Sequence, residues 1–415
     1  MTDLNSPVQS SLTHSTLKRS INLPLLVLYG LGTTIGAGIY VLVGGAAGRA
    51  GLYAPMAFII AAVGIAPTVA SYAELVGRYP QSAAEATYIE KGFRSTVMST
   101  LTGSLVIFSG IVAAAAITVG CAGYIQVFVD IPLWLAVLGI VLSMGLVAAW
   151  GILESVLLAA LFTLIEVGGL LALVVAGFYG TENLWDRVPE VIPNIGDAAI
   201  WAGIASAGLL AVFAFIGFED MVNVVEETKR PSFTMPMALA LTLLITALLY
   251  ALVTLVSVLS VAPETLAGST APLSTVYETL TGRSPIAISA IAIFATLNTI
   301  LIQFIMASRV IYGMADQSHL PKVFAQVNRT TRTPLLATVV VVAASGALAL
   351  AIPLDRLAES TSILILFIWT FANLALLLIK IRKEPAPKNC FVVPLWVPMV
   401  GLVFCCIFIA ISIFI

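Results

Sequence analysis

Residues 213–231 read FAFIGFEDMVNVVEETKRP, and they change from apolar to acidic within the length of one membrane-spanning helix. Gly217 lies at the apolar centre, and Glu219 and Asp220 follow it directly. Glycine costs about 1 kcal/mol in a helix interior, and ionisable side chains at bilayer depth usually face the interior of a bundle or water. The stretch therefore predicts a helix that is interrupted near Gly217 and lines a pathway.

A second glycine-rich stretch lies nearer the amino terminus, where residues 30–45 read GLGTTIGAGIYVLVGG. One interpretation is close helix packing, because Gly32 and Gly36 form a GxxxG pattern. The other is an unwound segment, which is tolerated at bilayer depth where it lines a cavity. The polar stretch at 213–231 favours the second interpretation, because two interrupted segments in matching positions are the best sequence indication of a transporter's binding site.

The composition places the chain in a lipid bilayer. Of its 415 residues, 60% are hydrophobic and 10% are charged, against about 25% charged in an ordinary soluble domain. A spanning helix needs about 20 apolar residues, and the apolar runs predict eleven spans at 21–46, 53–77, 96–127, 131–150, 153–179, 201–227, 235–260, 285–314, 334–351, 360–380 and 392–414. The predicted fold class is an all-α integral membrane protein with about 11 transmembrane helices.

The order of the spans predicts the domain organisation. The first and sixth spans are five apart, the offset expected of two inverted repeats of five helices with interrupted helices 1 and 6. We therefore expect a ten-helix transport core at 21–380, made of a first repeat at 21–179 and a second at 201–380, and an additional transmembrane helix at 392–414. Residues 1–20 are rich in Ser, Thr and Asn and predict a disordered cytoplasmic tail.

The basic residues predict the orientation. Fifteen of the 19 Lys and Arg residues fall on the side that carries the amino terminus, and four, Arg49, Arg187, Arg283 and Arg356, fall on the other. Because cytoplasmic loops carry the excess of basic residues, we expect a multi-pass protein of the cytoplasmic membrane with the amino terminus inside and the carboxyl terminus outside.

Several classes of function are excluded or disfavoured. The formal net charge of −2 gives no reason to expect a nucleic-acid partner. Two histidines, and four cysteines without a recurrent spacing, predict no metal site and no cofactor. No GxxxxGK[ST] phosphate loop is present, and no nucleophile, base and orienting group are grouped as an enzyme requires. The chemistry is therefore expected between the helices and is not expected to be enzymatic.

Four stretches carry a family resemblance: GTTIGAGIY at 32–40, YAELVGRYPQSAAEATYIEKGF at 72–93, FAFIGFEDMVNVVEETKRP at 213–231 and ASRVIYGMADQSHLP at 307–321. In order and spacing they resemble motifs of the amino acid, polyamine and organocation transporter superfamily. The resemblance implies a five-plus-five inverted-repeat fold like that of the leucine transporter, alternating access and a central site for an amino acid or related amine. The chain departs from many relatives, which have twelve spans, because it ends after an eleventh predicted span. The resemblance therefore does not imply an oligomer built on the last helix.

Broken helices supply what a zwitterionic substrate needs. Backbone N–H groups at a helix start near Ala37 and Gly38 would bind the carboxylate, and the Thr34 hydroxyl would add a donor. Carbonyls in the unwound part of the sixth span would accept from the ammonium group. The residues expected to contribute them are Phe213, Ala214 and Ile216.

Two phenylalanines and two acids at the sixth span have two interpretations each. Phe215 and Phe218 either pack in the core or form an aromatic gate over the substrate. Glu219 and Asp220 either bond to neighbouring helix ends or reach a cationic side chain. With no arginine or acid among the expected contacts themselves, a small or medium neutral amino acid is the favoured substrate.

Glu166 is the candidate for proton coupling, because it lies near the middle of the apolar fifth span. On the GxxES pattern at 151–155, its position is that of a lysine found in some proton-coupled relatives. Three interpretations remain open: a proton carrier donating to first-helix carbonyls, a ligand for a cation, and a permanently neutral structural carboxyl.

Glu74 near the end of the second span, and Glu226 and Glu227 at the end of the sixth, are expected to form an inner gate with neighbouring basic residues. The alternative for those basic residues is snorkelling at the interface. The complete interpretation is a secondary transporter of amino acids or related amines, coupled to protons. An obligate exchanger that uses no ion and a membrane-embedded amine sensor are the alternatives.

Overall fold

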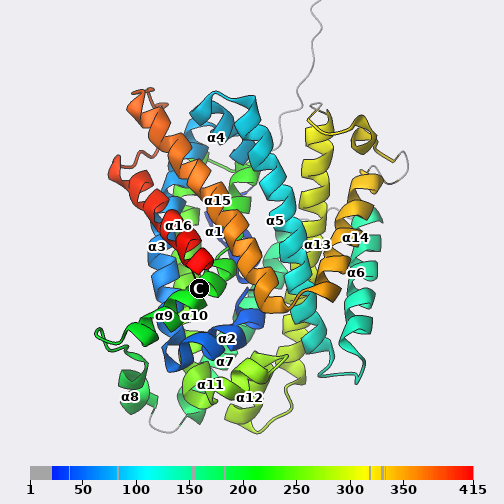
Figure 1. Cartoon of the computed structure of the whole chain (residues 1–415), viewed down its shortest axis with the longest axis vertical. Coiled ribbons are helices and arrows are strands. Elements are labelled where there is room, and N and C mark those ends of the chain that lie inside the picture. The colour runs from blue at the N-terminus through cyan, green and yellow to red at the C-terminus, as the bar shows by residue number, and fades with distance from the viewer. Residues whose placement is uncertain are drawn as a thin grey trace, which may run out of the picture.

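The computed structural model describes residues 21–36, 38–81, 84–150, 156–181, 184–316, 319–328, 331 and 333–414. Within these ranges the chain is built of helices, and the only strand-like pairing is an isolated bridge between Ile21 and Thr228. Figure 1 shows the helices side by side in one bundle. The predicted all-α class is confirmed.

The continuous long helices agree with the predicted spans to within a few residues at most ends. They are α3 (Ala54–Arg78), α5 (Thr96–Ile125), α6 (Leu133–Trp150), α7 (Val156–Gly180), α10 (Pro231–Ser260), α13 (Ile286–Asp316), α14 (Leu335–Ala351), α15 (Leu354–Ile381) and α16 (Trp396–Phe414). The largest difference is at α15, which begins at Leu354 and not at the predicted residue 360. Its first two turns carry Asp355, Arg356 and Glu359, so they are helical without being apolar.

Two of the predicted spans are each divided into two helices. The first becomes α1 (Leu23–Ile35) and α2 (Gly38–Ala50), and the sixth becomes α9 (Ala198–Ala214) and the 3-10 helix η3 (Phe218–Glu227). The predicted interruptions are therefore confirmed, and the first falls between the end of α1 at Ile35 and the start of α2 at Gly38. That η3 is wound as a 3-10 helix was not predicted.

Short helices occupy segments that the sequence left as loops. They are η1 (Gly51–Tyr53), α4 (Ala84–Phe93), α8 (Leu184–Arg187), η2 (Val188–Val191), α11 (Pro263–Gly268), α12 (Pro272–Thr281) and η4 (Lys322–Ala325). A proline at the first helical position starts α11 and α12, which suits a residue that has no N–H to donate. α11 packs on α2, and α12 packs on α7 and α13, so these two helices cover one end of the bundle.

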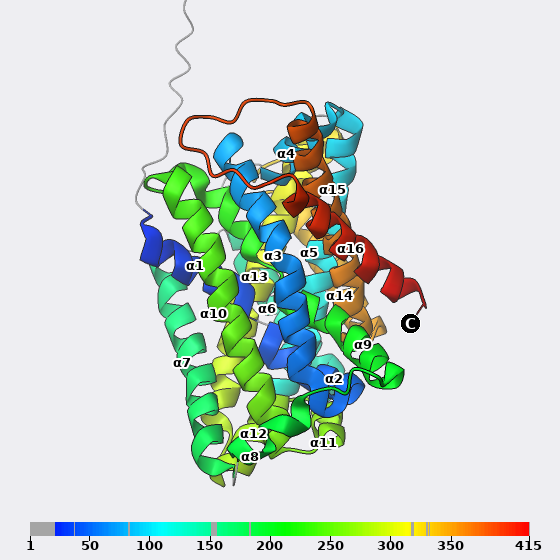
Figure 2. The same ribbon diagram turned by 90° about the vertical axis from the view of Figure 1, so that its left-hand side faces the viewer.

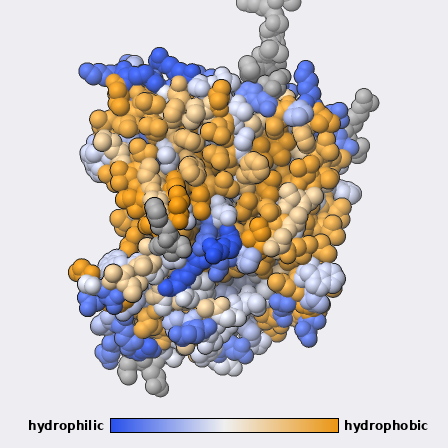
Figure 3. Space-filling model, in the orientation of Figure 1, coloured by the Kyte–Doolittle hydropathy of each residue, from blue (hydrophilic) through white to orange (hydrophobic). Residues whose placement is uncertain are grey.

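The bundle has two distinct ends, which Figures 1 and 2 show at top and bottom. We name them the α4 end, which carries α4, and the α12 end, which carries α8, α11 and α12. On the face that Figure 3 shows, a largely apolar region lies between hydrophilic residues at the two ends. In the described part of the chain nine helical segments are long and apolar enough to cross a membrane. The protein is accordingly a multi-pass membrane protein.

Backbone contacts hold the two divided spans next to each other. The Ile21 amide donates to the Glu227 carbonyl at 3.1 Å, and the Lys229 amide donates to the Ile21 carbonyl at 2.8 Å. The Asn22 side chain caps α1 by accepting from the Leu25 amide at 3.1 Å. The beginning of α1 is thereby attached to the end of η3, and the two breaks are brought to the same depth.

Candidate functional site

The two helix breaks touch each other at the centre of the bundle. Gly217 has a φ of +120°, a conformation that favours glycine. A Cβ there would lie 2.4 Å from the Thr33 carbonyl oxygen, and a Cβ on Gly38 would lie 2.4 Å from the Ala214 Cα. The Thr33 hydroxyl lies 3.0 Å from the Gly217 carbonyl. The absence of side chains at these two glycines therefore allows the two unwound segments to meet.

Tyr250 on α10 connects the two breaks. Its hydroxyl lies 3.0 Å from the Thr34 carbonyl and 2.9 Å from the Ala214 carbonyl, and its single hydrogen is shared between them. The ring is fully buried and lies 5.2 Å from the Phe215 ring, centre to centre. Tyr250 was not predicted from the sequence, although a lone tyrosine in an apolar span needs a hydrogen-bond partner and was a usable signal.

The residues expected to bind the carboxylate lie at the first break. Gly38 begins α2, and Thr34 is buried one residue before the end of α1. The Thr34 hydroxyl has no hydrogen-bond partner among the described residues. Ala37, the other residue of that group, lies outside the described residues. The break therefore presents one buried hydroxyl whose hydrogen-bonding capacity is unused.

The carbonyls expected to bind the ammonium group are partly occupied by the protein itself. The Phe213 carbonyl accepts from the Ile216 amide at 3.1 Å, and the Ala214 carbonyl accepts from Tyr250. The expectation that all three are open is corrected accordingly, because buried carbonyls find partners within the fold. Of the three carbonyls, that of Ile216 is the one that accepts no backbone hydrogen bond in the turns, loops and caps of the described residues.

Phe215 and Phe218 are both packed in the core in this conformation. Phe218 lies 5.6 Å from Tyr72 in an edge-on arrangement and 5.1 Å from Trp369. Phe215 is fully buried against Tyr250. Their placement agrees with the packing interpretation, and the aromatic gate stays a prediction that needs another conformation.

Glu166 lies on α7 beside the first break and is 2% exposed. One turn before it, Thr163 packs on α1 so closely that a Cβ on Gly32 would lie 2.2 Å from the Thr163 hydroxyl oxygen. The Glu166 carboxyl interacts electrostatically with the Tyr40 and Tyr250 hydroxyls, and its backbone carbonyl accepts from Tyr40 at 2.8 Å. The carboxyl group is therefore next to the tyrosine that joins the two breaks.

Glu74 lies in a buried ionic cluster at the α4 end. Its carboxylate is 2.8 Å from the Arg78 guanidinium and 2.7 Å from the Lys380 ammonium, and it accepts from the Val393 amide at 2.8 Å. These partners come from α3, from the end of α15 and from residues 382–395, which we name the connector. The cations that bind Glu74 are thus not the expected neighbours on the sixth span.

The other two acids of the expected inner gate lie elsewhere in the described structure. Glu226 is exposed and Glu227 is half-buried, and both lie at the end of η3. The Glu227 backbone carbonyl, not its side chain, makes the contact with Ile21. The groups that bind Glu74 in the described structure do not include Glu226 or Glu227.

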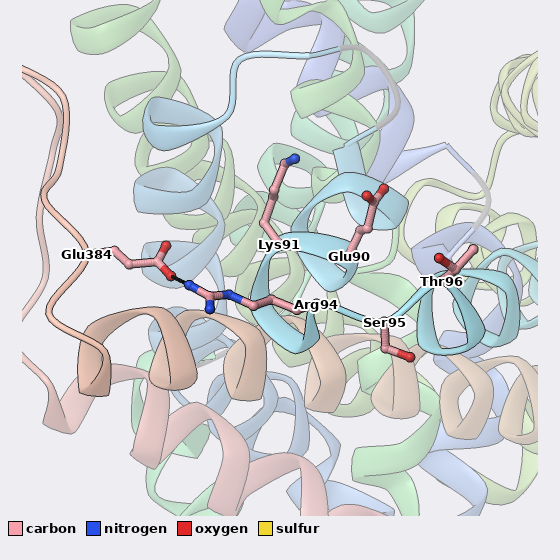
Figure 4. A pocket seen from close by; sticks show the side chains of 6 residues that line it. All are labelled: Glu90, Lys91, Arg94, Ser95, Thr96 and Glu384. Atoms are coloured by element: carbon pink, nitrogen blue, oxygen red, sulfur yellow. Dashed lines mark hydrogen bonds and ion pairs between the residues drawn. The ribbon is translucent and has the colours of Figure 1, made fainter.

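The connector and α4 also border a shallow pocket of about 470 Å³. Figure 4 shows that Arg94 reaches across to Glu384, and their charged groups are 3.0 Å apart. The remaining lining residues are Glu90, Lys91, Ser95 and Thr96. None of these residues belongs to a broken helix, so the pocket is separate from the candidate site.

A second ionic cluster closes the α12 end and was also missed by the sequence analysis. Arg49 at the end of α2 binds Glu359 on α15 and lies 3.8 Å from the Asp355 carboxylate. Arg356 lies 3.2 Å from the other oxygen of Glu359. The spacing of Asp355 and Glu359, four residues apart at the start of a helix, was the available signal.

Comparison with known proteins identifies the family. Residues 21–415 match the model of the amino acid permease family. The chain belongs to this family. The permease is 28% identical over 413 residues to the branched-chain amino acid permease BcaP of Bacillus subtilis, covering 94% of this chain and 87% of that protein.

Of two further relatives, one has a name that states a substrate class and the other does not. The permease is 27% identical to cationic amino acid transporter 4 of Mus musculus, which it matches over 92% of its own length and 63% of the mouse protein, less than two thirds. It is 30% identical to an uncharacterized transporter of Mycobacterium tuberculosis strain H37Rv, over 94% of this chain and 85% of that protein. The family and these names are those of transporters, not enzymes.

Tyr250→Phe tests the connection between the breaks. The substitution removes the hydrogen that the Thr34 and Ala214 carbonyls share, and a buried polar group without a partner costs about 1–3 kcal/mol. We expect the thermal unfolding temperature of the purified permease to fall. The control is Tyr179→Phe, since Tyr179 is 90% exposed. Equal unfolding temperatures for the two variants would show that the bridge contributes nothing.

Proposed function

We propose that the permease is a secondary transporter that moves amino acids across the cell membrane by alternating access. The observation that carries the proposal is the junction of the two broken helices, bridged by Tyr250 and bearing the buried Thr34 hydroxyl. Unwound backbone in the middle of a bundle offers donors and acceptors that lipid-facing helices do not have. In this proposal residues 21–179 and 201–380 are two inverted repeats, and 392–414 is an additional helix.

The preferred substrate in this proposal is a small or medium neutral amino acid. The start of α2 at Gly38 would bind the carboxylate, with the Thr34 hydroxyl as a further donor. The Ile216 carbonyl would accept from the ammonium group. Glu219 supports a neutral substrate, because its carboxylate already accepts from the Gly217 amide at 3.0 Å and so serves the end of a helix. The names of the relatives divide between branched-chain and cationic amino acids, and this contact favours the uncharged side chain.

Alternating access requires that closing contacts break at one end at a time. In this structure ion pairs join helices at both ends, around Glu74 at the α4 end and around Arg49 at the α12 end. We propose that these two clusters separate in turn when the site opens. The excess of basic residues on the amino-terminal side supports a cytoplasmic α4 end and amino terminus, with the carboxyl terminus outside.

Glu166→Gln tests coupling to protons. If Glu166 carries the coupled proton, the glutamine variant cannot load or release it, and a pH gradient will no longer drive accumulation. Exchange of internal for external substrate should remain measurable, because exchange does not require the proton to be released. The measurement is uptake of labelled amino acid into liposomes with an imposed pH gradient, and the control is Glu278→Gln at an exposed position on α12. Accumulation that survives in Glu166→Gln would remove Glu166 from the mechanism.

The wider experiment uses the purified permease in liposomes with a panel of labelled amino acids and amines, and with imposed proton or sodium gradients. Uptake of neutral amino acids that rises with an inward proton gradient is expected. Counterflow that is insensitive to both gradients would favour the obligate exchanger. Binding of an amine without any flux would favour a sensor and overturn the proposal.

A further inference from the structure

Three carboxyl groups lie together on the α4 side of the second break. Glu219 and Asp220 belong to η3, Glu85 belongs to α4, and the charges of all three act on one another. Among the described residues no lysine, arginine or histidine forms an ion pair with any of them. Like charges this close cannot all stay ionised in a partly buried place without a bound cation. We name Glu85, Glu219 and Asp220 the carboxyl cluster.

Two tyrosine hydroxyls at the carboxyl cluster are a second, independent indication that the cluster is a binding site. Tyr72 and Tyr88 are fully buried, and neither hydroxyl has a hydrogen-bond partner among the described residues. Their rings lie edge-on at 6.2 Å, and the Tyr72 ring meets the Phe218 ring at the start of η3 at 5.6 Å. Both hydroxyls interact electrostatically with Glu85, and that of Tyr72 also interacts with Glu219. Leaving two such groups unsatisfied is costly, at about 1–3 kcal/mol each.

The carboxyl cluster is bonded directly to the backbone of the break. The Glu219 carboxylate accepts from the Gly217 amide at 3.0 Å, and the Asp220 amide donates to the Gly217 carbonyl at 3.1 Å. An ionised Glu219 is the better acceptor, because hydrogen bonds to charged groups are stronger than those between neutral groups. The protonation of the cluster therefore bears directly on the hydrogen bond that holds the break at Gly217.

The surroundings of Glu85 favour binding of a proton near neutrality. Burial raises the pKa of Glu85 to about 7, its own backbone amide lowers that pKa, and the charge of Asp220 raises it. The titratable groups that face the cluster are Tyr72 from α3 and Tyr88 from α4 itself. In the described part of the chain, α5 and α15, which pack on α4, contribute no charge that acts on Glu85.

We propose that Glu85, Asp220 and Glu219 form a proton-binding site whose occupancy controls the helix break at Gly217. Water at the α4 end supplies the proton, which adds to one carboxylate oxygen of the Glu85 and Asp220 pair and returns to water on release. The Tyr72 and Tyr88 hydroxyls, which interact electrostatically with Glu85, keep their own protons. The site deepens the proposed function, because it is a proton site at the substrate-binding break that is separate from Glu166.

The direct test is an infrared titration of the full-length permease in lipid nanodiscs without any amino acid. The band of protonated carboxyl groups should contain a component that disappears with a midpoint near pH 7, matching the pKa of Glu85. Glu85→Gln should remove that component, whereas Glu90→Gln, at an exposed position on the same helix, should keep it. Asp220→Asn should move the midpoint to lower pH, because it removes the negative charge that holds the proton on Glu85. An unchanged titration in Glu85→Gln or in Asp220→Asn would overturn the proposal.

Thermal unfolding gives a second readout that does not depend on transport. The folded permease keeps the Glu85 proton up to about pH 7, whereas an ordinary glutamic acid loses it near pH 4.5. The folded state therefore binds more protons between these values, and stability should decrease as the pH rises through this window. The decrease should be smaller in Glu85→Gln than in the wild type and in Glu90→Gln. An equal decrease in all three proteins would argue against the site.

Exchange of substrate in liposomes then links the site to the break. The rate in the wild type should change with the pH on the α4 side around pH 7, and the rate in Glu85→Gln should not. If no amino acid is transported but the infrared component behaves as expected, the proton site stands and the proposed function fails. If transport is observed without the infrared component, the function stands and the proton site fails.

Discussion

Replacing Glu74 by alanine is expected to destabilise the permease by about 3–5 kcal/mol, because breaking a buried ion pair leaves its partner charges uncompensated. The carboxylate is fully buried and binds Arg78 and Lys380, whose side chains are 6% and 10% exposed. It also accepts from the Val393 amide of the connector. Its removal should therefore weaken the attachment of the connector to α3, which keeps the bond from Arg78 to the Glu384 carbonyl, and lower the unfolding temperature.

The measurement is thermal unfolding of the purified variant, together with limited proteolysis of the connector. The control is Glu190→Ala, which removes a pair with Arg187 whose side chains are 36% and 42% exposed, and such pairs contribute about 0–1 kcal/mol. Glu74→Met combined with Lys380→Met should recover part of the loss, because it leaves Arg78 as the only cation of the cluster without its carboxylate partner. An unfolding temperature for Glu74→Ala that matches that of Glu190→Ala would show that the buried ion pairs of Glu74 do not stabilise this conformation.

Gly217→Ala is expected to give the largest loss of transport among single substitutions at the break. Gly217 has a φ of +120°, and a Cβ there would lie 2.4 Å from the Thr33 carbonyl oxygen. Backbone strain of this kind costs about 1–3 kcal/mol, and the two breaks must move apart to relieve it. Because each 1.36 kcal/mol in a barrier is about tenfold in rate, a fall of about ten- to hundredfold is expected.

Initial rates of substrate exchange in liposomes, at matched amounts of folded protein, measure this effect. Gly168→Ala on α7 and Gly313→Ala on α13 are the controls, because a Cβ at either helical glycine would meet nothing within 4 Å. Both should retain wild-type rates. A Gly217→Ala variant that transports as fast as these controls would mean that the contact between the two breaks is unimportant for transport.

The sequence was informative about the fold because lipid imposes simple constraints. Apolar length alone located the spans, since a helix must satisfy all its own backbone groups in hydrocarbon. Gly36, Gly38 and Gly217 also located the two interruptions, because glycine weakens a helix wherever it stands. The short helix α4 could not be predicted in this way, because Ala84–Phe93 lies outside the apolar runs from which the spans were predicted.

The candidate site was predicted less completely than the fold. The local sequence pattern indicated Thr34, Gly38 and Ala214, which lie at the breaks. It also predicted open carbonyls at Phe213 and Ala214, but within the fold these accept hydrogen bonds from Ile216 and Tyr250. Tyr250 follows Ala214 by 36 residues, and no local pattern connects them. The assignment of Glu74 to a gate with the sixth span missed Lys380 for the same reason, since the two lie far apart in the chain.

By itself the sequence determined that this chain crosses the membrane many times and that its first and sixth spans are broken, since hydrophobic length and glycine content act locally along the chain. Only the tertiary structure decided which groups meet at those breaks. Tyr250 joins them, Glu85 comes beside Asp220, and Lys380 reaches Glu74 because helices distant in sequence pack side by side. Partner choice among buried polar groups depends on that packing, because each group accepts whichever donor the surrounding helices place within about 3 Å.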